Sequence, residues 1–364
     1  MNCSVFGECG GCSLPLSYAD QLDCKLSAFE KLDLGAPQAV FQSPHKGYRA
    51  RAEFKVYRDE HGLHFAMFAK QKPVIIADCP ILLPHLQELL SKLKRLLNQD
   101  LAFASKLFAV EVLGVVGGGS LLTLIYHRKL DQEWEAQAKL LAQSLGTILI
   151  GRSRSQKVII SQETLLDLVS CQSGRYTFVR YDNSFSQPNP YMNAKMIDFA
   201  LSCVGANAVD LLELYCGGGN FTLPLSARFR NVFATEVDRT AINALKQNLA
   251  LNAIQNVFCA RMSGEESIQA LSFEREFVRL QEVCLRDYDF THLLVDPPRS
   301  GIGDRRMLSF MGRFENIIYI SCNPLTLKQD LEILETTHHI QTFVVFDQFP
   351  YTHHLECGVW LKKK

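Results

Sequence analysis

Residues 210–221 read DLLELYCGGGNF, an apolar run that passes into a turn with three successive glycines. The apolar run predicts a buried strand, and the glycines let the backbone approach a ligand without obstruction from Cβ atoms. Glu236 ends the next apolar stretch, 19 residues after Gly217, where a carboxylate can accept hydrogen bonds from two ribose hydroxyls. This combination predicts a nucleotide-type cofactor site in an open α/β sheet, the alternative being a purely structural turn.

The second half of the chain alternates short apolar runs with helical stretches. The runs include NVFATEV, HLLVDPP and NIIYISCNP, and helical periodicity appears at residues 238–252 and 324–336. Such alternation is typical of βαβ units, which build a parallel sheet covered by helices. We therefore predict an α/β fold with a Rossmann-like domain over residues 176–364.

The first half predicts a different unit, an α+β domain over residues 37–175. Residues 48–56 place charged side chains at every second position, as a half-buried strand does. Helical periodicity follows at residues 81–98 and 131–145. Residues 1–36 precede this domain as a cysteine-rich segment.

The overall composition is that of an ordinary globular protein, with 364 residues, 47% hydrophobic and 21% charged, and no net charge. The sequence has no apolar run of about 18 residues that could span a membrane, and its N-terminus lacks the features of a secretory signal. We therefore expect a cytoplasmic protein with no membrane association. In that compartment the 12 cysteines are expected to be metal ligands, buried thiols or reactive groups rather than disulfides.

The details of the glycine turn distinguish two classes of cofactor. A dinucleotide site would close as G-x-G-x-x-G, whereas here Glu213 precedes the glycines and Asn220 follows them. This form is typical of methyltransferases, in which an adenosine and a methionine tail replace the pyrophosphate. Residues 295–299 (VDPPR) end a later strand, and Asp-Pro-Pro recurs on the substrate side of nucleic-acid methyltransferases. The two prolines fix φ where a target base must stack.

Cys322 is the candidate nucleophile, because it ends a strand in ISCNP beside a helix that begins at Pro324. C5 of uracil is not nucleophilic until a group adds to C6, and a thiolate both attacks and leaves readily. The helix N-terminus is expected to lower the pKa of this thiol. The alternative is a buried structural thiol, which is the interpretation we give to Cys203, Cys216, Cys259, Cys284 and Cys357.

A base is also required, because the C5 proton must leave once the methyl group has been transferred. The stretch FPYTHHLECG, residues 349–358, supplies the candidates. Glu356 precedes the last apolar strand and is preferred as the base. His353 or His354 is the second choice.

The order and spacing of five motifs resemble the RNA uracil-C5 methyltransferase family: NSFSQPNPYMN, LLELYCGGGNF, DPPRSG, ISCNP and FDQFPYTHHLECG. The likeness is detailed from about residue 176 onward and points in particular to the bacterial tRNA enzymes. It implies S-adenosyl-L-methionine as methyl donor and the T-loop uridine of tRNA, conventionally position 54, as substrate. The sequence gives no sign of an obligate protein partner. The alternatives are methylation of 23S rRNA and an RNA-binding or RNA-folding module with a vestigial cofactor site.

The resemblance also implies roles for individual residues. It assigns Cys322 as nucleophile and Glu356 as base, in agreement with the chemical argument. It implies cofactor contacts from five residues: Gln187, Tyr215, Asn220, Glu236 and Asp296. Arg299 is a candidate for contact with the substrate phosphate or base.

Four cysteines depart from the pattern of the familiar bacterial tRNA enzymes. Cys3, Cys9 and Cys12, with Cys79 downstream, resemble the iron–sulfur ligand set of the rRNA-modifying members. Four thiolates suffice for a [4Fe–4S] cluster, and zinc would accept the same ligands. The spacing is not that of radical enzymes, so we expect a structural or RNA-facing cluster.

Two groups of basic residues are candidates for contacts with RNA phosphates. The first comprises Lys46, Arg49, Arg51, Lys55 and Arg58, and the second comprises Arg152, Arg154 and Lys157. A solvated strand face would explain the same charges. The salt dependence of RNA binding separates the two interpretations, because phosphate contacts make affinity fall steeply with salt.

Overall fold

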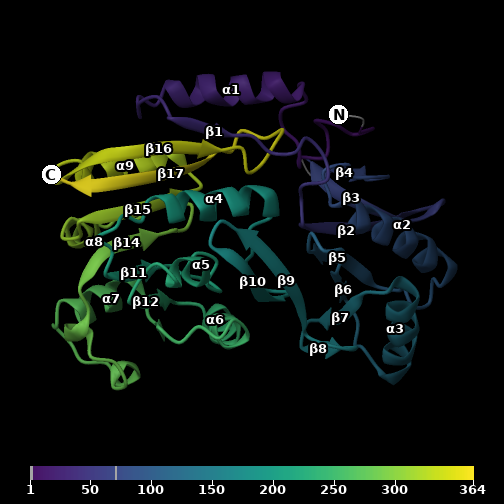
Figure 1. The fold of residues 1–364 in the computed structure, drawn as a ribbon. Coiled ribbons are helices and arrows are strands. Elements are labelled where there is room, and N and C mark those ends of the chain that lie inside the picture. The colour runs from purple at the N-terminus through teal and green to yellow at the C-terminus, as the bar shows by residue number, and fades with distance from the viewer. Residues whose placement is uncertain (1–2, 70–71) are drawn as a thin grey trace.

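Two large β-sheets and a hairpin between them organise the molecule (Figure 1). The computed structural model describes residues 3–69 and 72–364. The cysteine-rich N-terminal segment and α1 (Tyr18–Glu30) lie beside the last strands of the chain, so the N-terminal and C-terminal segments meet.

The larger sheet has eight strands and is parallel except at one of them. In order across the sheet the strands are β1 (Ala39–Phe41), β16 (His338–Phe346), β17 (Glu356–Lys363), β15 (Asn316–Ser321), β14 (Phe290–Val295), β11 (Asp210–Leu214), β12 (Asn231–Glu236) and β13 (Val257–Arg261). β17 runs antiparallel to both neighbours. The other pairs are parallel.

Helices cover both faces of this sheet because successive strand residues point to opposite cores. Leu212 and Leu214 pack into one core, and Leu211 packs into the other. The first core is covered by α1, α7 (Gly264–Leu271), α8 (Arg305–Met311) and α9 (Pro324–Leu334). The second is covered by α4 (Pro190–Ser202), α5 (Thr222–Ser226) and α6 (Arg239–Leu251). The predicted Rossmann-like architecture is confirmed.

The smaller sheet has seven strands and carries helices on one face. Its strands in order are β4 (Lys72–Ile75), β3 (Gly62–Ala69), β2 (Arg51–Asp59), β5 (Leu107–Gly114), β6 (Ser120–Tyr126), β7 (Ile148–Ser153) and β8 (Gln156–Ile159). α2 (Pro84–Gln99) and α3 (Gln132–Leu145) pack their apolar faces against it. The helix predicted from residue 81 begins at Pro84, because proline suits the first turn of a helix.

A hairpin of β9 (Thr164–Cys171) and β10 (Gly174–Tyr181) lies between the two sheets. Asn248 of α6 fastens it, because its Oδ1 atom accepts a hydrogen bond of 2.7 Å from the Val179 N–H. Two short 3-10 turns, Val278–Leu280 and Leu285–Asp287, connect α7 to β14.

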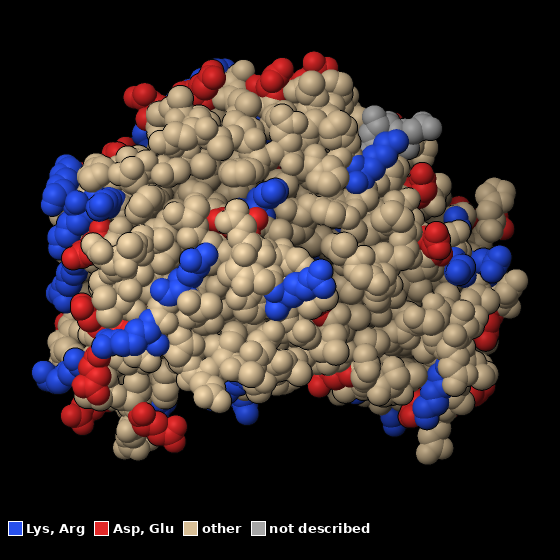
Figure 2. All heavy atoms as spheres, in the orientation of Figure 1, with Lys and Arg blue, Asp and Glu red and all other residues tan. Residues whose placement is uncertain are grey.

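The surface carries mixed charge. Figure 2 shows Lys and Arg interspersed with Asp and Glu over the face in view, in keeping with a formal net charge of zero. Across the two described ranges, no helix combines the length and apolarity that a membrane crossing requires.

Candidate functional site

The predicted cofactor residues lie along one edge of the eight-stranded sheet. β11, β12 and β14 are parallel and paired to their last residues. Tyr215 follows β11, Glu236 ends β12 and Asp296 follows β14. Because the carboxyl ends of parallel strands meet at one edge, these three residues are brought together where open α/β sheets bind their ligands.

Cys322 and Glu356 lie at facing ends of two antiparallel strands. Ser321, the last residue of β15, pairs with Cys357 of β17. The ladder stops at this pair, and Cys322 and Glu356 are the next residues of the two strands, so both lie at the same edge of the sheet. Asp296 follows the strand on the other side of β15. A thiol and two carboxyl groups therefore lie together at one edge, after β15, after β14 and at the start of β17, and both carboxyl groups act on the Cys322 thiol electrostatically.

Burial sets the protonation of these three groups. Glu356 is 4% exposed, and burial together with the Asp296 carboxyl raises its pKa to about 8. Burial raises the pKa of Asp296 to about 7. The pKa of Cys322 rises to about 11, chiefly through burial and then through the two carboxyl groups, while Arg299 acts in the opposite direction. The expected lowering by the helix N-terminus does not decide the pKa of Cys322, because burial and the two carboxyl groups raise it overall.

The glycine turn adopts backbone angles that favour glycine. Gly217 has φ 53° and Gly219 has φ 90°, while Tyr215 adopts φ 60° although it carries a side chain. A Cβ atom on Gly219 would lie 2.5 Å from Cδ1 of Leu245, so α6 packs directly against the turn. The Gly217 N–H donates to Oε2 of Glu236 at 3.0 Å, which fixes the carboxylate beside the turn.

Amide pairs orient the other predicted cofactor residues. Asn220 exchanges two hydrogen bonds of 2.8 Å with Asn193 of α4. Gln348 Nε2 donates to Oε1 of Gln187 at 2.7 Å, and Oε1 of Gln348 is a buried acceptor without a partner among the described residues. A fixed carboxylate, an open glycine turn and a buried spare acceptor fit a polar ligand such as S-adenosyl-L-methionine.

The remaining candidates differ in their exposure. His353 and His354 are exposed in the loop before β17, whereas Glu356 is buried. The structural interpretation of the other cysteines fits Cys203, Cys216 and Cys357, which are buried, and Cys259 is half-buried. Cys284 is exposed, so the expectation that it is a buried thiol is wrong.

Asp330 holds the loop that follows the DPPRSG motif, and the sequence analysis did not identify it. Its carboxylate accepts hydrogen bonds from the N–H groups of Ile302, at 2.8 Å, and Gly303, at 3.0 Å. It also accepts a bond of 2.6 Å from the Tyr319 hydroxyl. The sequence did contain a sign of this role, because Asp330 falls on the apolar face of α9, three residues after the buried Leu327.

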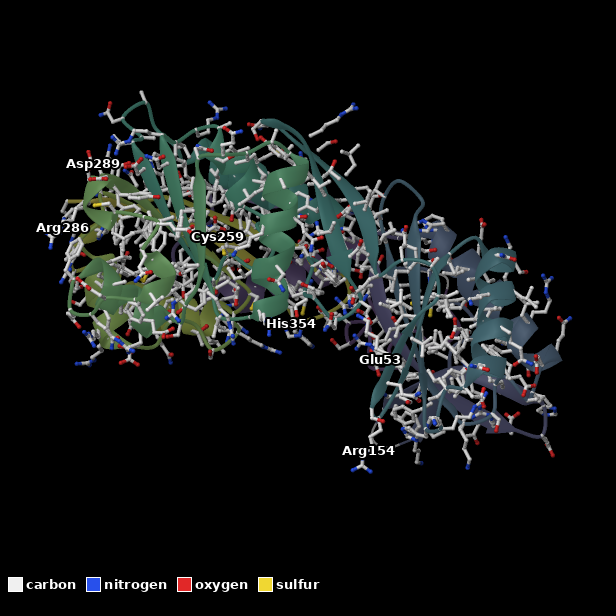
Figure 3. All side chains as sticks on the ribbon, turned by 90° about the horizontal axis from the view of Figure 1, so that it is seen from below. Glu53, Arg154, Cys259, Arg286, Asp289 and His354 are labelled. Carbon is white, nitrogen blue, oxygen red and sulfur yellow. The ribbon has the colours of Figure 1, made fainter. Side chains whose placement is uncertain are left out.

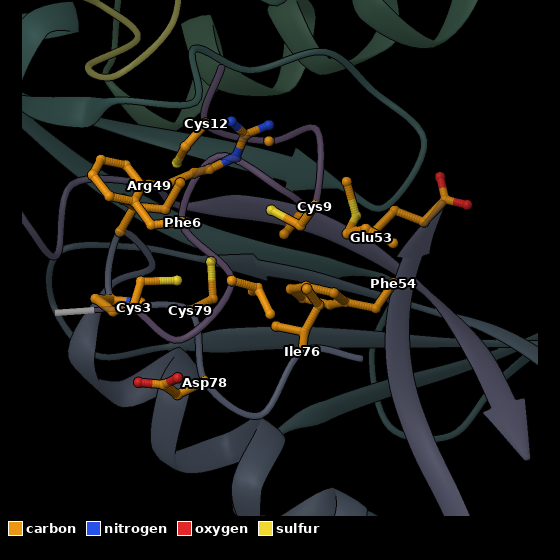
Figure 4. A pocket seen from close by; sticks show the side chains of 16 residues that line it. Cys3, Phe6, Cys9, Cys12, Arg49, Glu53, Phe54, Ile76, Asp78 and Cys79 are labelled. Carbon is orange, nitrogen blue, oxygen red and sulfur yellow. The ribbon is translucent and has the colours of Figure 1, made fainter. Parts of the chain in front are cut away.

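The four predicted metal ligands line one pocket. Figure 4 shows the sulfur atoms of Cys3, Cys9, Cys12 and Cys79 pointing into a shared space beside Arg49. Burial, followed by the neighbouring Cys9 thiol, raises the pKa of Cys12 to about 12. Over residues 3–69 and 72–364, no three His, Cys, Asp or Glu side chains are arranged to hold a metal ion. The donor chemistry thus suits a thiolate site, but the sulfur atoms do not enclose an ion in this arrangement.

Most of the basic residues predicted to contact RNA are engaged within the protein. Arg51 donates to the carbonyl oxygen atoms of Asp182 and Ser184, both at 2.5 Å. Arg152 and Lys157 form ion pairs of 2.6 and 3.1 Å with the buried Asp182 carboxylate. Three others also bind within the domain: Arg49, Lys55 and Arg58. Arg58 is nevertheless exposed, as are Lys46 and Arg154, and Arg154 projects outward in Figure 3.

Comparison with known proteins adds to this geometry. The tRNA (Uracil-5-)-methyltransferase family model matches residues 17–364. The tRNA/tmRNA (uracil-C(5))-methyltransferase of Wolinella succinogenes is 45% identical over 372 residues, covering 100% of both chains. The protein of the same name from Nitratiruptor sp. is 44% identical over 364 residues, again covering 100% of both chains.

A solved structure shares the fold. The crystal structure of Pyrococcus abyssi tRNA (uracil-54, C5)-methyltransferase, in complex with S-adenosyl-L-homocysteine, has a TM-score of 0.74 to this chain. It is 22% identical and covers 98% of this chain and 86% of its own. The likeness extends across both sheets and agrees with the match in sequence. This chain therefore belongs to the tRNA (uracil-5-)-methyltransferase family.

Proposed function

We propose that this chain is a cytoplasmic enzyme that methylates C5 of a uridine in tRNA, the T-loop uridine at position 54, with S-adenosyl-L-methionine as donor. Family membership and the names of the 44–45% identical relatives support the reaction and tRNA as substrate. The motif resemblance supports the T-loop position. The single observation that supports the chemistry is the Ser321–Cys357 strand pair, beyond which Cys322 and Glu356 are the next residues of the two strands.

Five side chains would hold the methyl donor: Gln187, Tyr215, Asn220, Glu236 and Asp296. The hydrogen bond from the Gly217 N–H keeps Glu236 beside the glycine turn, and the paired amides orient Gln187 and Asn220. When bound, the donor supplies an electrophilic methyl group on a sulfonium sulfur. The half-buried Asp296 lies between the cofactor residues and Cys322, because β14 separates β11 from β15.

The chain's own residues then make and break the bonds at the base. The Cys322 thiol releases its proton to solvent and its sulfur bonds to C6, so the electron pair of the C5–C6 double bond becomes available at C5. C5 uses that pair to bond to the methyl carbon, whose bond to the sulfonium sulfur breaks and leaves its electron pair on that sulfur. Glu356, as carboxylate, removes the proton from C5, the C5–C6 double bond re-forms and the C6–sulfur bond breaks. A base with a pKa of about 8 is well suited to this step near neutral pH.

Replacement of Cys322 tests the covalent step. We expect Cys322→Ala to abolish methylation of a tRNA transcript and, having no thiol, to form no denaturation-resistant adduct with tRNA that contains 5-fluorouridine. The wild-type protein should form that adduct, because fluorine at C5 cannot leave as a proton. Cys259→Ala, at a half-buried cysteine on the opposite edge of the cofactor region, is the matched control and should retain both properties. Normal turnover by Cys322→Ala would overturn the mechanism.

Labelled donor with separate RNAs tests the substrate. We expect label in tRNA and none in tRNA with cytidine at position 54 or in a 23S rRNA transcript. Label in the rRNA alone would instead establish the ribosomal alternative, which the four cysteines favour by their resemblance to rRNA-modifying enzymes. Binding of tRNA without transfer of label would indicate an RNA-binding or RNA-folding module.

We also propose that the four-cysteine pocket, lined by Cys3, Cys9, Cys12 and Cys79, binds a [4Fe–4S] cluster, with zinc as the alternative. The convergence of four thiols on one pocket supports this proposal, although the sulfur atoms would have to draw together. Protein purified without oxygen should contain iron and sulfide, and Cys79→Ser should lose them. Cys24→Ser, at an exposed cysteine on α1, is the control. Protein free of iron and zinc would contradict the proposal.

The division of the chain is likewise a proposal: a cysteine-rich segment over residues 1–36, an RNA-contacting domain over 37–175 and the methyltransferase domain over 176–364. The exposed Lys46 and Arg154 of the middle unit support its contact with RNA.

A further inference from the structure

The segment that connects β16 to Glu356 is held by a buried ion pair from the N-terminal helix. Lys25 of α1 lies 2.5 Å from Oδ1 of Asp347, and both side chains are completely buried. The same ammonium group donates to the carbonyl oxygen of Phe349 at 2.8 Å. Gln21, one turn earlier on α1, donates to Oδ2 of Asp347 at 3.0 Å. Side chains of α1 thus bind both a side chain and a backbone carbonyl group of this segment. Figure 1 shows α1 beside this end of the chain.

Tyr351, four residues after Asp347, is held in an unusual backbone conformation by residues of the N-terminal segment. Its φ is 63°, a region that residues with side chains rarely adopt. The Tyr351 N–H donates to Oε1 of Gln21 at 3.0 Å, and its hydroxyl donates to the carbonyl oxygen of His45 at 3.1 Å. The Tyr351 carbonyl accepts from the Leu14 N–H at 2.8 Å. Such a conformation persists only where the surroundings fix it, and here residues 14–45 supply every one of these contacts.

This held segment carries two functional contacts. Gln348 within it donates to Gln187, one of the proposed cofactor residues. Glu356, the proposed base, begins the strand that follows it. The geometry of residues 347–351 therefore sets the orientation of both groups. A buried ion pair adds little net stability compared with a well-packed apolar pair, but it fixes direction, so its presence here needs a reason beyond stability.

We propose that Lys25 and Gln21 are positioning residues for methyl transfer. From α1 they hold residues 347–351 so that Gln348 meets Gln187 and Glu356 lies opposite Cys322. This proposal rests on the proposed function, because it assigns to Glu356 the removal of the C5 proton. Neither Lys25 nor Gln21 touches the reacting atoms, so they act through the segment that they hold.

Lys25→Met tests the proposal in the full-length protein. We expect kcat on tRNA to fall about 100-fold, the scale of effect for displacement of a catalytic group by about 1 Å, with the KM for tRNA within about twofold of the wild type. Because removal of the C5 proton is the step that slows, the covalent adduct with ordinary tRNA should accumulate on a denaturing gel. Hydrogen exchange should become faster in residues 347–355.

Two further variants separate positioning from a general loss of stability. Arg230→Met breaks the 2.5 Å ion pair to the buried Asp210 at the other end of β11, and it should keep kcat within about twofold of the wild type. The double variant Lys25→Met, Asp347→Leu leaves no unpaired buried charge, so its stability should recover while kcat stays low. The proposal would be overturned if the double variant recovered both stability and kcat, or if Lys25→Met had a normal kcat. If the wild type itself methylated no RNA, the proposed function would fail, and hydrogen exchange in residues 347–355 would still decide whether Lys25 holds them.

Discussion

At the scale of single residues, the proposed chemistry depends on how the surroundings of Glu356 change its pKa. Its pKa of about 8 lies well above the ordinary value of a glutamic acid, because the side chain is buried and lies near Asp296. The carboxylate is the form that removes a proton. The kcat of the wild type should therefore increase as the pH rises through about 8 and then level off.

Glu356→Gln keeps the size of the side chain and removes its ability to accept the proton. We expect kcat to fall by about 10²–10⁴, the usual contribution of a general base, and the rise through pH 8 to disappear. The variant should still attack C6 and transfer the methyl group, so a covalent complex with ordinary tRNA should build up. These properties are measured by a pH–rate profile and a denaturing gel. A variant that kept the rise through pH 8 would assign it to another titrating group, with the Asp296 carboxyl, whose pKa burial raises to about 7, as the nearest candidate.

Some residues of the site could be predicted from the sequence and others could not. Cys322, Glu356 and Glu236 lie next to apolar runs in the sequence, and such a run predicts where a strand begins or ends. The protonation states of these residues could not be predicted from the sequence. The pKa of Cys322 moves opposite to the expected direction, because burial and then two carboxyl groups from other strands raise it.

At the scale of elements, α9 links the strand that ends at Ser321 to the loop after DPPRSG. Asp330→Leu would leave the N–H groups of Ile302 and Gly303 without their acceptor. We expect a loss of about 1–3 kcal/mol in the free energy of unfolding per unsatisfied buried group, together with a lower kcat/KM for tRNA because the loop that carries Arg299 is released. Urea unfolding and steady-state kinetics measure the two effects.

The matched control is Glu332→Gln, at an exposed carboxyl group on the same helix. It should leave both quantities unchanged within error. An Asp330→Leu protein as stable as the wild type would show that the three hydrogen bonds are replaced by water.

Periodicity predicted most elements closely and missed those that depend on distant partners. The helices at residues 131–145 and 238–252 are found at Gln132–Leu145 and Arg239–Leu251. The β9–β10 hairpin was not predicted, because its strands show no clear alternation of polar and apolar residues. The antiparallel insertion of β17 between β15 and β16 was not predicted either, because strand order depends on contacts between residues far apart in sequence.

At the scale of the whole molecule, only part of the positive charge is free to meet RNA. Lys46→Ala should weaken tRNA binding and reduce the slope of log affinity against log salt by about 1, because one phosphate contact is lost. Arg51→Ala should leave that slope unchanged, since Arg51 is bound to the backbone of residues 182 and 184. It should instead raise the KM for the methyl donor, because that backbone leads to Gln187. Equal salt slopes for the two variants would contradict this assignment.

The ion pairs to Asp182 explain why charge patterning alone overestimated how many basic residues in the first half are free to contact RNA. Alternation of arginine with apolar residues correctly indicated a strand, and β2 begins at Arg51. It could not show that Arg51 and Arg152 find their acceptors at Asp182, more than 20 residues away in sequence, or that Asp182 also pairs with Lys157.

The pairing of α1 with residues 347–351 has a consequence for biosynthesis. Lys25 is translated 322 residues before Asp347, the residue whose carboxylate neutralises it. Glu356, at the start of β17, is translated later still. A nascent or prematurely terminated polypeptide that stops before these residues therefore lacks the proposed proton acceptor and cannot complete a modification.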